Sequence, residues 1–190
     1  EGDVAERSLA LARGLGDRVT VAGFSLGGLL TSWIAQREDV ARAVPLIPFL
    51  GVLGLPVRIA PAAAALALRL PNTFRWWDPI RRERQMPEHG YPRYTTHAIA
   101  QLYLLAHELL ETARTQPARA KEIVVVTNKR EGAVNNRAIA ILVERWRALR
   151  GDVETFSFDD LPISHDIIEP SRHSWTAERV YPDIIRLLAP

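Results

Sequence analysis

The sequence predicts an α/β protein in which about four parallel strands are flanked by helices. Three short apolar runs and one alternating run are typical of strands, and they span residues 19–22, 43–47, 121–127 and 153–158. Apolar residues at helical spacing indicate helices over residues 5–15, 29–36, 136–150 and 176–188. Because strands and helices alternate, we expect the strands to pair in parallel, with helices on both faces of the sheet.

A long interruption separates the second expected strand from the third. It covers residues 49–116, far more than the dozen or so residues that a crossover between parallel strands needs. Helical spacing recurs within it over residues 60–70 and 96–114. Its middle is rich in arginine, proline and aromatic residues, including Trp76 and Trp77. We therefore expect an inserted helical cap over residues 51–116, between two parts of the core at residues 1–50 and 117–190.

Composition is that of a globular protein and excludes several classes of function. Hydrophobic residues make up 47% of the 190 and charged residues 24%, the net charge is +2, and there is no cysteine. The small charge argues against a nucleic-acid partner, and the lack of cysteine excludes disulfides, a thiolate nucleophile and cysteine-ligated metal. The apolar residues 46–70 contain prolines and arginines, so no transmembrane segment is expected. No signal peptide is visible, and we expect a cytoplasmic protein.

The run Gly-Phe-Ser-Leu-Gly-Gly at residues 23–28 carries the clearest chemistry in the sequence. It stands between an expected strand and an expected helix, which is the context that an exposed nucleophilic serine requires. Glycine at positions 23 and 27, followed by Gly28, would let the strained turn at Ser25 approach the strand and the helix without collision. The backbone N–H of Leu26 would then lie at a helix N-terminus, where it can donate to an oxyanion.

Residues 19–28 resemble the nucleophile elbow of the α/β-hydrolase superfamily, in which serine, acid and histidine follow one another along the chain. The resemblance implies a catalytic triad. Glu131 occupies the place of the acid after the strand that follows the cap, in a pattern similar to the superfamily's acid-x-x-Val. His165 follows the last expected strand at loop distance. Imidazole suits a general base because its pKa lies near neutral pH, and the acid would hold it in one tautomer.

Other residues compete for two of these roles. Rival acids come directly after the last expected strand, at Asp159 and Asp160. Four further histidines are rival bases: His89, His97, His107 and His173. Of these, His97 and His107 stand on an expected cap helix, where they would line a pocket or pack. No spacing of histidines and carboxylates suggests a metal site, and no cofactor is expected.

These residues together predict a serine hydrolase that cleaves carboxylic esters. The resemblance points to carboxylesterases and to monoacylglycerol-lipase or lysophospholipase-like proteins, with a small ester or acyl compound as substrate. The apolar residues 53–70 would suit an acyl chain, and Phe24, Trp76 and Trp77 are candidate pocket residues, with packing between cap and core as the alternative for the tryptophans. An acyltransferase with the same triad, a serine aminopeptidase and an inactive interaction module stay open, as does the oligomeric state.

The resemblance matches only the second half of the superfamily pattern. The elbow stands at residue 25, so the strands expected before it, and the loop that supplies a second oxyanion donor, are not in this sequence. We expect an N-terminally truncated form, most simply a fragment. A partner chain that completes the sheet, or a pared-down member of the superfamily, would produce the same pattern. A sheet cut in this way would expose an edge and an apolar side.

Overall fold

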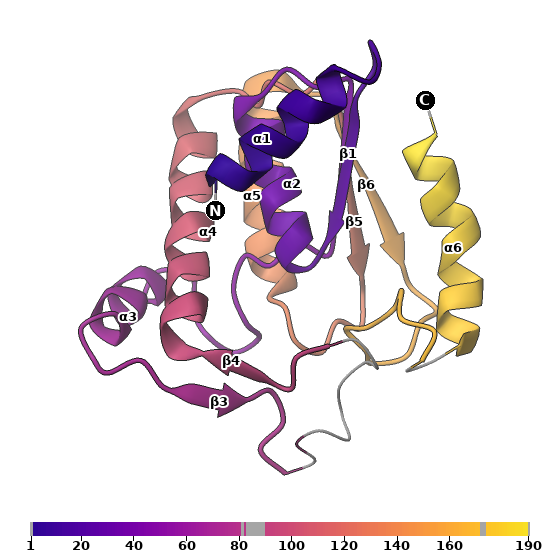
Figure 1. Ribbon diagram of the computed structural model, residues 1–190. Helices are drawn as coiled ribbons and strands as arrows, with labels where there is room; N and C mark the ends of the chain where they lie inside the picture. Colours follow the sequence, from indigo (N-terminus) through magenta and orange to yellow (C-terminus); the bar gives the residue numbers. More distant parts are fainter. Residues whose placement is uncertain (1, 81, 83–89, 172–173, 190) are drawn as a thin grey trace.

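The computed structural model describes residues 2–80, 82, 90–171 and 174–189 of the chain (Figure 1). Its helices and strands follow in the order α1 (Gly2–Arg13), β1 (Thr20–Phe24), α2 (Leu26–Arg37), β2 (Arg42–Leu46), α3 (Ala60–Ala67), β3 (Phe74–Trp76), β4 (Arg93–Thr95), α4 (Thr96–Thr115), β5 (Glu122–Asn128), α5 (Asn136–Arg150), β6 (Val153–Phe158) and α6 (Ser174–Leu188).

Four strands form one parallel sheet in the order β1-β2-β5-β6, which confirms the predicted fold class. The strand order runs in one direction along the sheet. Right-handed crossovers therefore bring the connecting helices α2, α4 and α5 to the same face, and α6 lies on the opposite face (Figure 1). The core lies between the sheet and the three helices, where Val125, Leu142 and Trp146 are fully buried.

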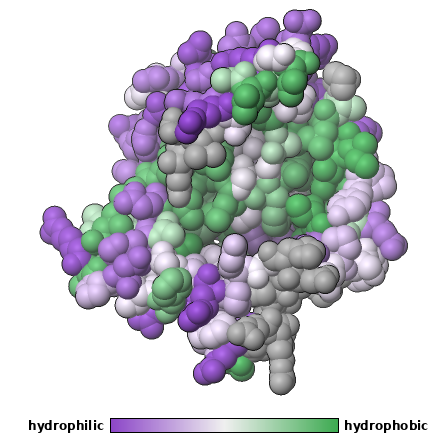
Figure 2. Space-filling view, in the orientation of Figure 1, coloured by the Kyte–Doolittle hydropathy of each residue, from purple (hydrophilic) through white to green (hydrophobic). Residues whose placement is uncertain are grey.

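Strand β1 forms one edge of the sheet. It pairs with β2 alone among the described strands, and its residues Thr20 and Ala22 are exposed. Figure 2 shows apolar residues gathered in the middle of the face that looks onto this edge, with polar residues around them. An exposed edge and an apolar side were both expected from the sequence.

The segment between β2 and β5 differs from the expected helical cap in two ways. First, α4 packs against α2 and α5, so it is the crossover helix of the core. Its buried residues, including Leu102, Leu109 and Leu110, form the apolar face with which this amphipathic helix packs against its neighbours. Second, residues 74–76 and 93–95, which showed no helical spacing, pair as an antiparallel hairpin, β3 with β4, within a segment that was expected to be mostly helical. Residues 51–95, with the single short helix α3 among their described part, remain the candidate cap.

The hairpin lies beyond the carboxyl ends of the sheet strands, at the bottom of the view in Figure 1. Through the described ranges, none of the helices combines the length and the apolar character that crossing a bilayer requires.

Candidate active site

The turn between β1 and α2 holds Ser25 in a strained conformation. Its backbone angles are φ 54° and ψ −109°, in a region that residues other than glycine rarely adopt. Two backbone hydrogen bonds to the residues at the end of β2 hold Ser25 in this conformation. Ser25 N–H donates to the Leu46 carbonyl at 2.9 Å, and Phe49 N–H donates to the Ser25 carbonyl at 2.9 Å. Serine at this position commonly caps the helix with its hydroxyl, but the hydroxyl of Ser25 makes no capping bond. It is therefore free to point away from α2.

Two of the three glycines of the turn are crowded by backbone atoms of other residues. A Cβ on Gly23 would lie 2.4 Å from the backbone of Gly27, and a Cβ on Gly28 would lie 2.8 Å from the Leu46 carbonyl oxygen and from the Cα of Pro48. A Cβ on Gly27 would meet nothing within 4 Å. The expectation that glycine is needed on both sides of Ser25 to avoid collision was thus right for Gly23 and wrong for Gly27. The close approach on the helix side falls one residue later, where α2 crosses the end of β2.

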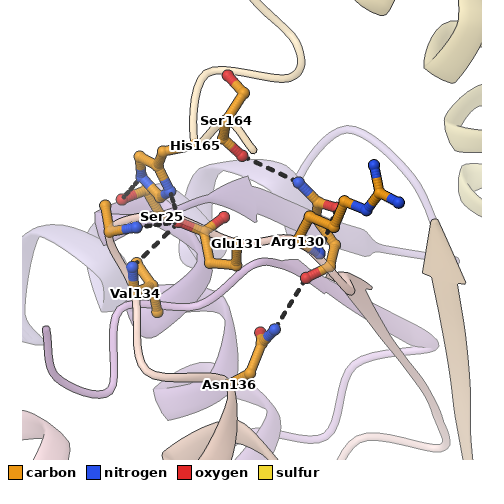
Figure 3. Close-up of polar contacts among 9 residues, drawn as sticks. Ser25, Arg130, Glu131, Val134, Asn136, Ser164 and His165 are labelled. Carbon is orange, nitrogen blue, oxygen red and sulfur yellow. Dashed lines mark hydrogen bonds and ion pairs between the residues drawn. The ribbon is translucent and has the colours of Figure 1, made fainter. Parts of the chain in front are cut away.

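Three side chains predicted from the sequence lie in a chain of hydrogen bonds (Figure 3). The Oγ of Ser25 is 2.8 Å from Nε2 of His165, and Nδ1 of the same ring is 3.0 Å from Oε1 of Glu131. An ionised carboxylate can only accept a hydrogen bond, so Nδ1 of His165 carries the ring proton and donates a hydrogen bond to Glu131. Nε2 is then unprotonated and accepts from the hydroxyl of Ser25. The geometry thus leaves a basic nitrogen against the serine oxygen.

The turn after β5 holds Glu131 as a carboxylate. Its side chain is fully buried. Oε1 accepts from the backbone N–H of Ala133 at 2.7 Å and of Val134 at 3.0 Å, as well as from His165. Burial alone would raise the pKa of Glu131, but the hydrogen bonds from His165 and the two N–H groups outweigh it and hold the pKa below its usual range. The other oxygen, Oε2, is buried without a hydrogen-bond partner within the described part of the chain.

The rival acids and bases lie elsewhere. Asp159 accepts from the hydroxyl of Ser157 at 2.8 Å, and Asp160 pairs with Arg179 at 2.9 Å. The Nε2 of His97 is 2.8 Å from the Leu70 carbonyl oxygen. His107 lines an apolar hollow away from the serine, whereas His89 and His173 lie outside the described residues.

The candidate pocket residues lie at two different places. The ring of Phe24 packs against that of His165, with 4.9 Å between their centroids. Trp76 and Trp77 belong to the β3–β4 hairpin region. Trp77 contacts Tyr94 at 4.4 Å between centroids, and Trp76 lies under the guanidinium of Arg93.

A shallow, mostly apolar hollow lies between α3 and α4. Its lining includes Leu50, Leu55, Tyr103 and His107, but neither tryptophan and none of Ser25, Glu131 and His165. The hollow is therefore separate from the hydrogen-bonded serine.

The site also contains a backbone donor and a residue that sequence reasoning missed. Leu26 is the first residue of α2, so no helical carbonyl can accept its N–H, which stays available beside Ser25. Asn128, the last residue of β5, is fully buried between the loops of Glu131 and His165. A polar residue at the carboxyl end of the clearest strand was the signal that could have found it. The described residues hold no group of three or more metal-ligating side chains.

The parallel strand order, the strained serine between β1 and α2, and the loops after β5 and β6 are those of the α/β-hydrolase fold, and the chain has this fold. Solved structures agree. A monoacylglycerol lipase from Paleococcus ferrophilus matches with a TM-score of 0.67 at 16% identity, over 97% of this chain and 73% of its own. A soluble variant of monoglyceride lipase from Saccharomyces cerevisiae, in complex with a substrate analogue, matches with a TM-score of 0.67 at 12% identity, over 98% of this chain and 66% of its own.

Sequence comparison adds little to this. No family model matches the chain. Ribonuclease VapC22 from Mycobacterium tuberculosis is 29% identical over an alignment of 98 residues, and the match covers 42% of this chain and 74% of the ribonuclease. That match leaves more than half of this chain unaligned, whereas the two lipase structures follow nearly all of it. The fold and the site therefore carry the functional conclusion.

Proposed function

We propose that the protein is a serine hydrolase that cleaves carboxylic esters through an acyl-enzyme on Ser25. The observation that carries the proposal is the 2.8 Å contact between the Oγ of Ser25 and Nε2 of His165, in a ring whose Nδ1 is bonded to Glu131 at 3.0 Å. Serine is a poor nucleophile at its ordinary pKa and needs such an adjacent base. The resemblance of the fold to two lipases supports the substrate class without fixing it.

The reaction follows from the proton positions. The Oγ of Ser25 attacks the ester carbonyl carbon while its proton passes to Nε2 of His165. The tetrahedral intermediate collapses, and the alcohol leaves with the proton that His165 returns. Water then attacks the acyl-enzyme, gives its proton to His165, and the carboxylic acid is released when the proton returns to Ser25. Glu131 holds the ring in the required tautomer and stabilises the imidazolium during both steps.

Charge on the carbonyl oxygen needs donors that are in place before the reaction. The N–H of Leu26 is one such donor, because it points out of the first turn of α2, where the partial positive charge of the helix is concentrated. Ser25 and Leu26 are adjacent in the chain, so an ester carbonyl over the hydroxyl would lie within reach of this N–H.

The acyl chain would lie along the segment that follows β2. This segment begins beside the acid turn, because Leu53 N–H donates to the Ala133 carbonyl at 2.7 Å and Val52 bridges to Val134. Several large apolar side chains are exposed along it: Leu53, Ile59, Leu66 and Leu70. An apolar chain that left the site in this direction would cover them, which favours esters of longer acids.

Labelling of the serine tests the proposal. A fluorophosphonate should react with the wild-type chain at Ser25, and p-nitrophenyl esters should be hydrolysed. Ser25→Ala should abolish labelling and lower hydrolysis by at least about 10³-fold. Ser157→Ala, which removes an exposed hydroxyl on β6, is the matched control and should behave as wild type. Labelling that survives Ser25→Ala would overturn the assignment.

A further inference from the structure

Asn128 is a buried polar residue that the proposed chemistry does not use. It is the last residue of β5 and has no exposed surface. A carboxamide in this position is expected to be hydrogen-bonded, since an unpaired buried polar group destabilises the folded state. Its partners therefore indicate what the side chain does.

The two ends of the Asn128 carboxamide contact the two loops that carry Glu131 and His165. Its Nδ2 donates to the carbonyl of Ser164, the residue before His165, at 2.9 Å. Its Oδ1 accepts from the N–H of Arg130, the residue before Glu131, at 3.0 Å. Figure 3 labels Ser164 and Arg130, the residues whose backbone groups make these two hydrogen bonds.

The backbone carbonyl of Asn128 makes two further hydrogen bonds to the region of Glu131. The carbonyl of Asn128 accepts from the N–H of Glu131 at 3.1 Å and from Nδ2 of Asn136, in the first turn of α5, at 2.8 Å. The acid turn is thus fixed to the strand by backbone and side chain together. The histidine loop contains no helix or strand over residues 159–171, so the bond from Nδ2 ties an irregular segment to a rigid one.

We propose that Asn128 is a positioning residue that sets the separation of Glu131 and His165. The inference rests on the proposed function. Asparagine suits the role because one planar group presents a donor to the histidine loop and an acceptor to the acid turn. Aspartate has the same shape but lacks the donor, and its charge would lie beside Glu131. The neutral amide joins the loops without opposing the ionised acid.

Asn128→Asp separates this role from general stability. The substitution keeps the acceptor for Arg130 N–H and replaces the donor to Ser164 by an oxygen that repels its carbonyl. Gln36→Glu is the matched control. Gln36 is equally buried, accepts from Trp146 Nε1 at 2.7 Å and donates to the Gln116 carbonyl at 3.1 Å, but it stands in the last turn of α2, about 16 Å along the helix from Ser25.

Two readouts distinguish positioning from packing. In wild type, the proton that His165 Nδ1 donates to Glu131 should give a low-field imidazole signal in the NMR spectrum. Asn128→Asp should shift or lose this signal and lower kcat by about 10–100-fold with little change in KM, because a misplacement of about 1 Å is costly in rate. Gln36→Glu should keep both the signal and kcat, even if it unfolds more easily.

The pH profile adds a third readout. A buried carboxyl near Glu131 has a raised pKa in Asn128→Asp, and when protonated it can donate to the Ser164 carbonyl. The ratio of variant to wild-type kcat should therefore rise as the pH falls from 8 to 6. Should Asn128→Asp fail to fold, the neutral Asn128→Ser should fold, since it keeps a short donor, and show a smaller loss of kcat.

Each result supports or overturns the proposal. A folded Asn128→Asp or Asn128→Ser with wild-type kcat and an unchanged imidazole signal would refute it, as would an equal loss of kcat in Gln36→Glu. A ratio independent of pH would also count against it. If wild type proves inactive and unlabelled, the proposed function fails, and the imidazole signal in the variants still tests whether Asn128 positions the pair.

Discussion

The turn after β5 and the segment after β2 both begin at the carboxyl ends of neighbouring parallel strands, but they differ in their hydrogen bonds and in their exposure. In the turn, Asn128, Glu131 and Asn135 all bond neighbouring backbone groups through their side chains. In the segment, large apolar side chains are exposed. Leu53, for example, has 60% of its surface accessible to solvent. The two meet where Asn135 N–H donates to the Gly51 carbonyl at 2.9 Å. Polar groups are thus fixed where chemistry is proposed, while apolar surface lies open beside them.

The largest expected effect concerns the fixed turn. Glu131→Gln should lower kcat by about 10⁴-fold, because an amide can donate to Nδ1 and so stabilise the wrong tautomer of His165. Steady-state kinetics on p-nitrophenyl acetate measures this. Asp159→Asn and Asp160→Asn change the rival acids, which bond Ser157 and Arg179, and should leave kcat unchanged. A large loss in either control, with little in Glu131→Gln, would identify a different acid.

The next effect concerns the strained turn at Ser25, where two adjacent glycines should respond in opposite ways. Gly28→Ala places a Cβ 2.8 Å from the backbone of Leu46 and Pro48, and should destabilise the protein by about 3 kcal/mol or more. Gly27→Ala places a Cβ in open space on a helix, and should stabilise it by about 0.5–1 kcal/mol. Urea unfolding of the pair measures both. Similar changes in the two variants would mean that α2 does not approach β2 as closely as described.

These glycines show where sequence reasoning succeeded and where it stopped. The roles of Ser25, Glu131 and His165 could be predicted from the resemblance to the α/β-hydrolase superfamily, in which serine, acid and histidine follow in this order. Each of the three also follows an expected strand, and parallel strands bring their carboxyl ends together. Which glycine is crowded depends on the neighbouring strand, since the atoms that approach Gly28 belong to residues 46 and 48. The residues next to Gly28 in the sequence therefore do not reveal how closely residues 46 and 48 approach it.

The inserted segment was harder to predict for a related reason. Residues 96–114 read correctly as a helix, but its place in the core is set by contacts with α2 and α5, which are distant in sequence. The hairpin strands are only three residues each, too short for alternation to be seen. Asn128 escaped notice because an isolated asparagine after a strand is also what an ordinary turn contains.

A smaller effect concerns the pH dependence of stability. The pKa of Glu131 is lowered on folding, so its ionised form stabilises the folded protein at pH values above the ordinary carboxyl pKa of about 4.3. That contribution should be lost as the pH falls from there through the lower pKa of the folded state. The difference in unfolding free energy between wild type and Glu131→Gln should therefore shrink over this range. Glu154→Gln, at an exposed position of β6, is the control, and an equal shrinkage there would contradict the expectation.

The smallest effect concerns the open apolar segment. Leu53→Ser removes an exposed side chain beside the acid turn, so the unfolding free energy should change by less than about 0.5 kcal/mol. If an acyl chain covers this side chain, about 1 kcal/mol of contact is lost, since each buried methylene contributes about 0.8 kcal/mol. The kcat/KM for p-nitrophenyl decanoate should then fall about fivefold, whereas that for the acetate should stay unchanged. Leu149→Ser, an exposed leucine on α5, should alter neither ester. Equal losses on both esters in Leu53→Ser would show that the segment supports the turn rather than the substrate, and the contrast between the two regions would then be one of exposure alone.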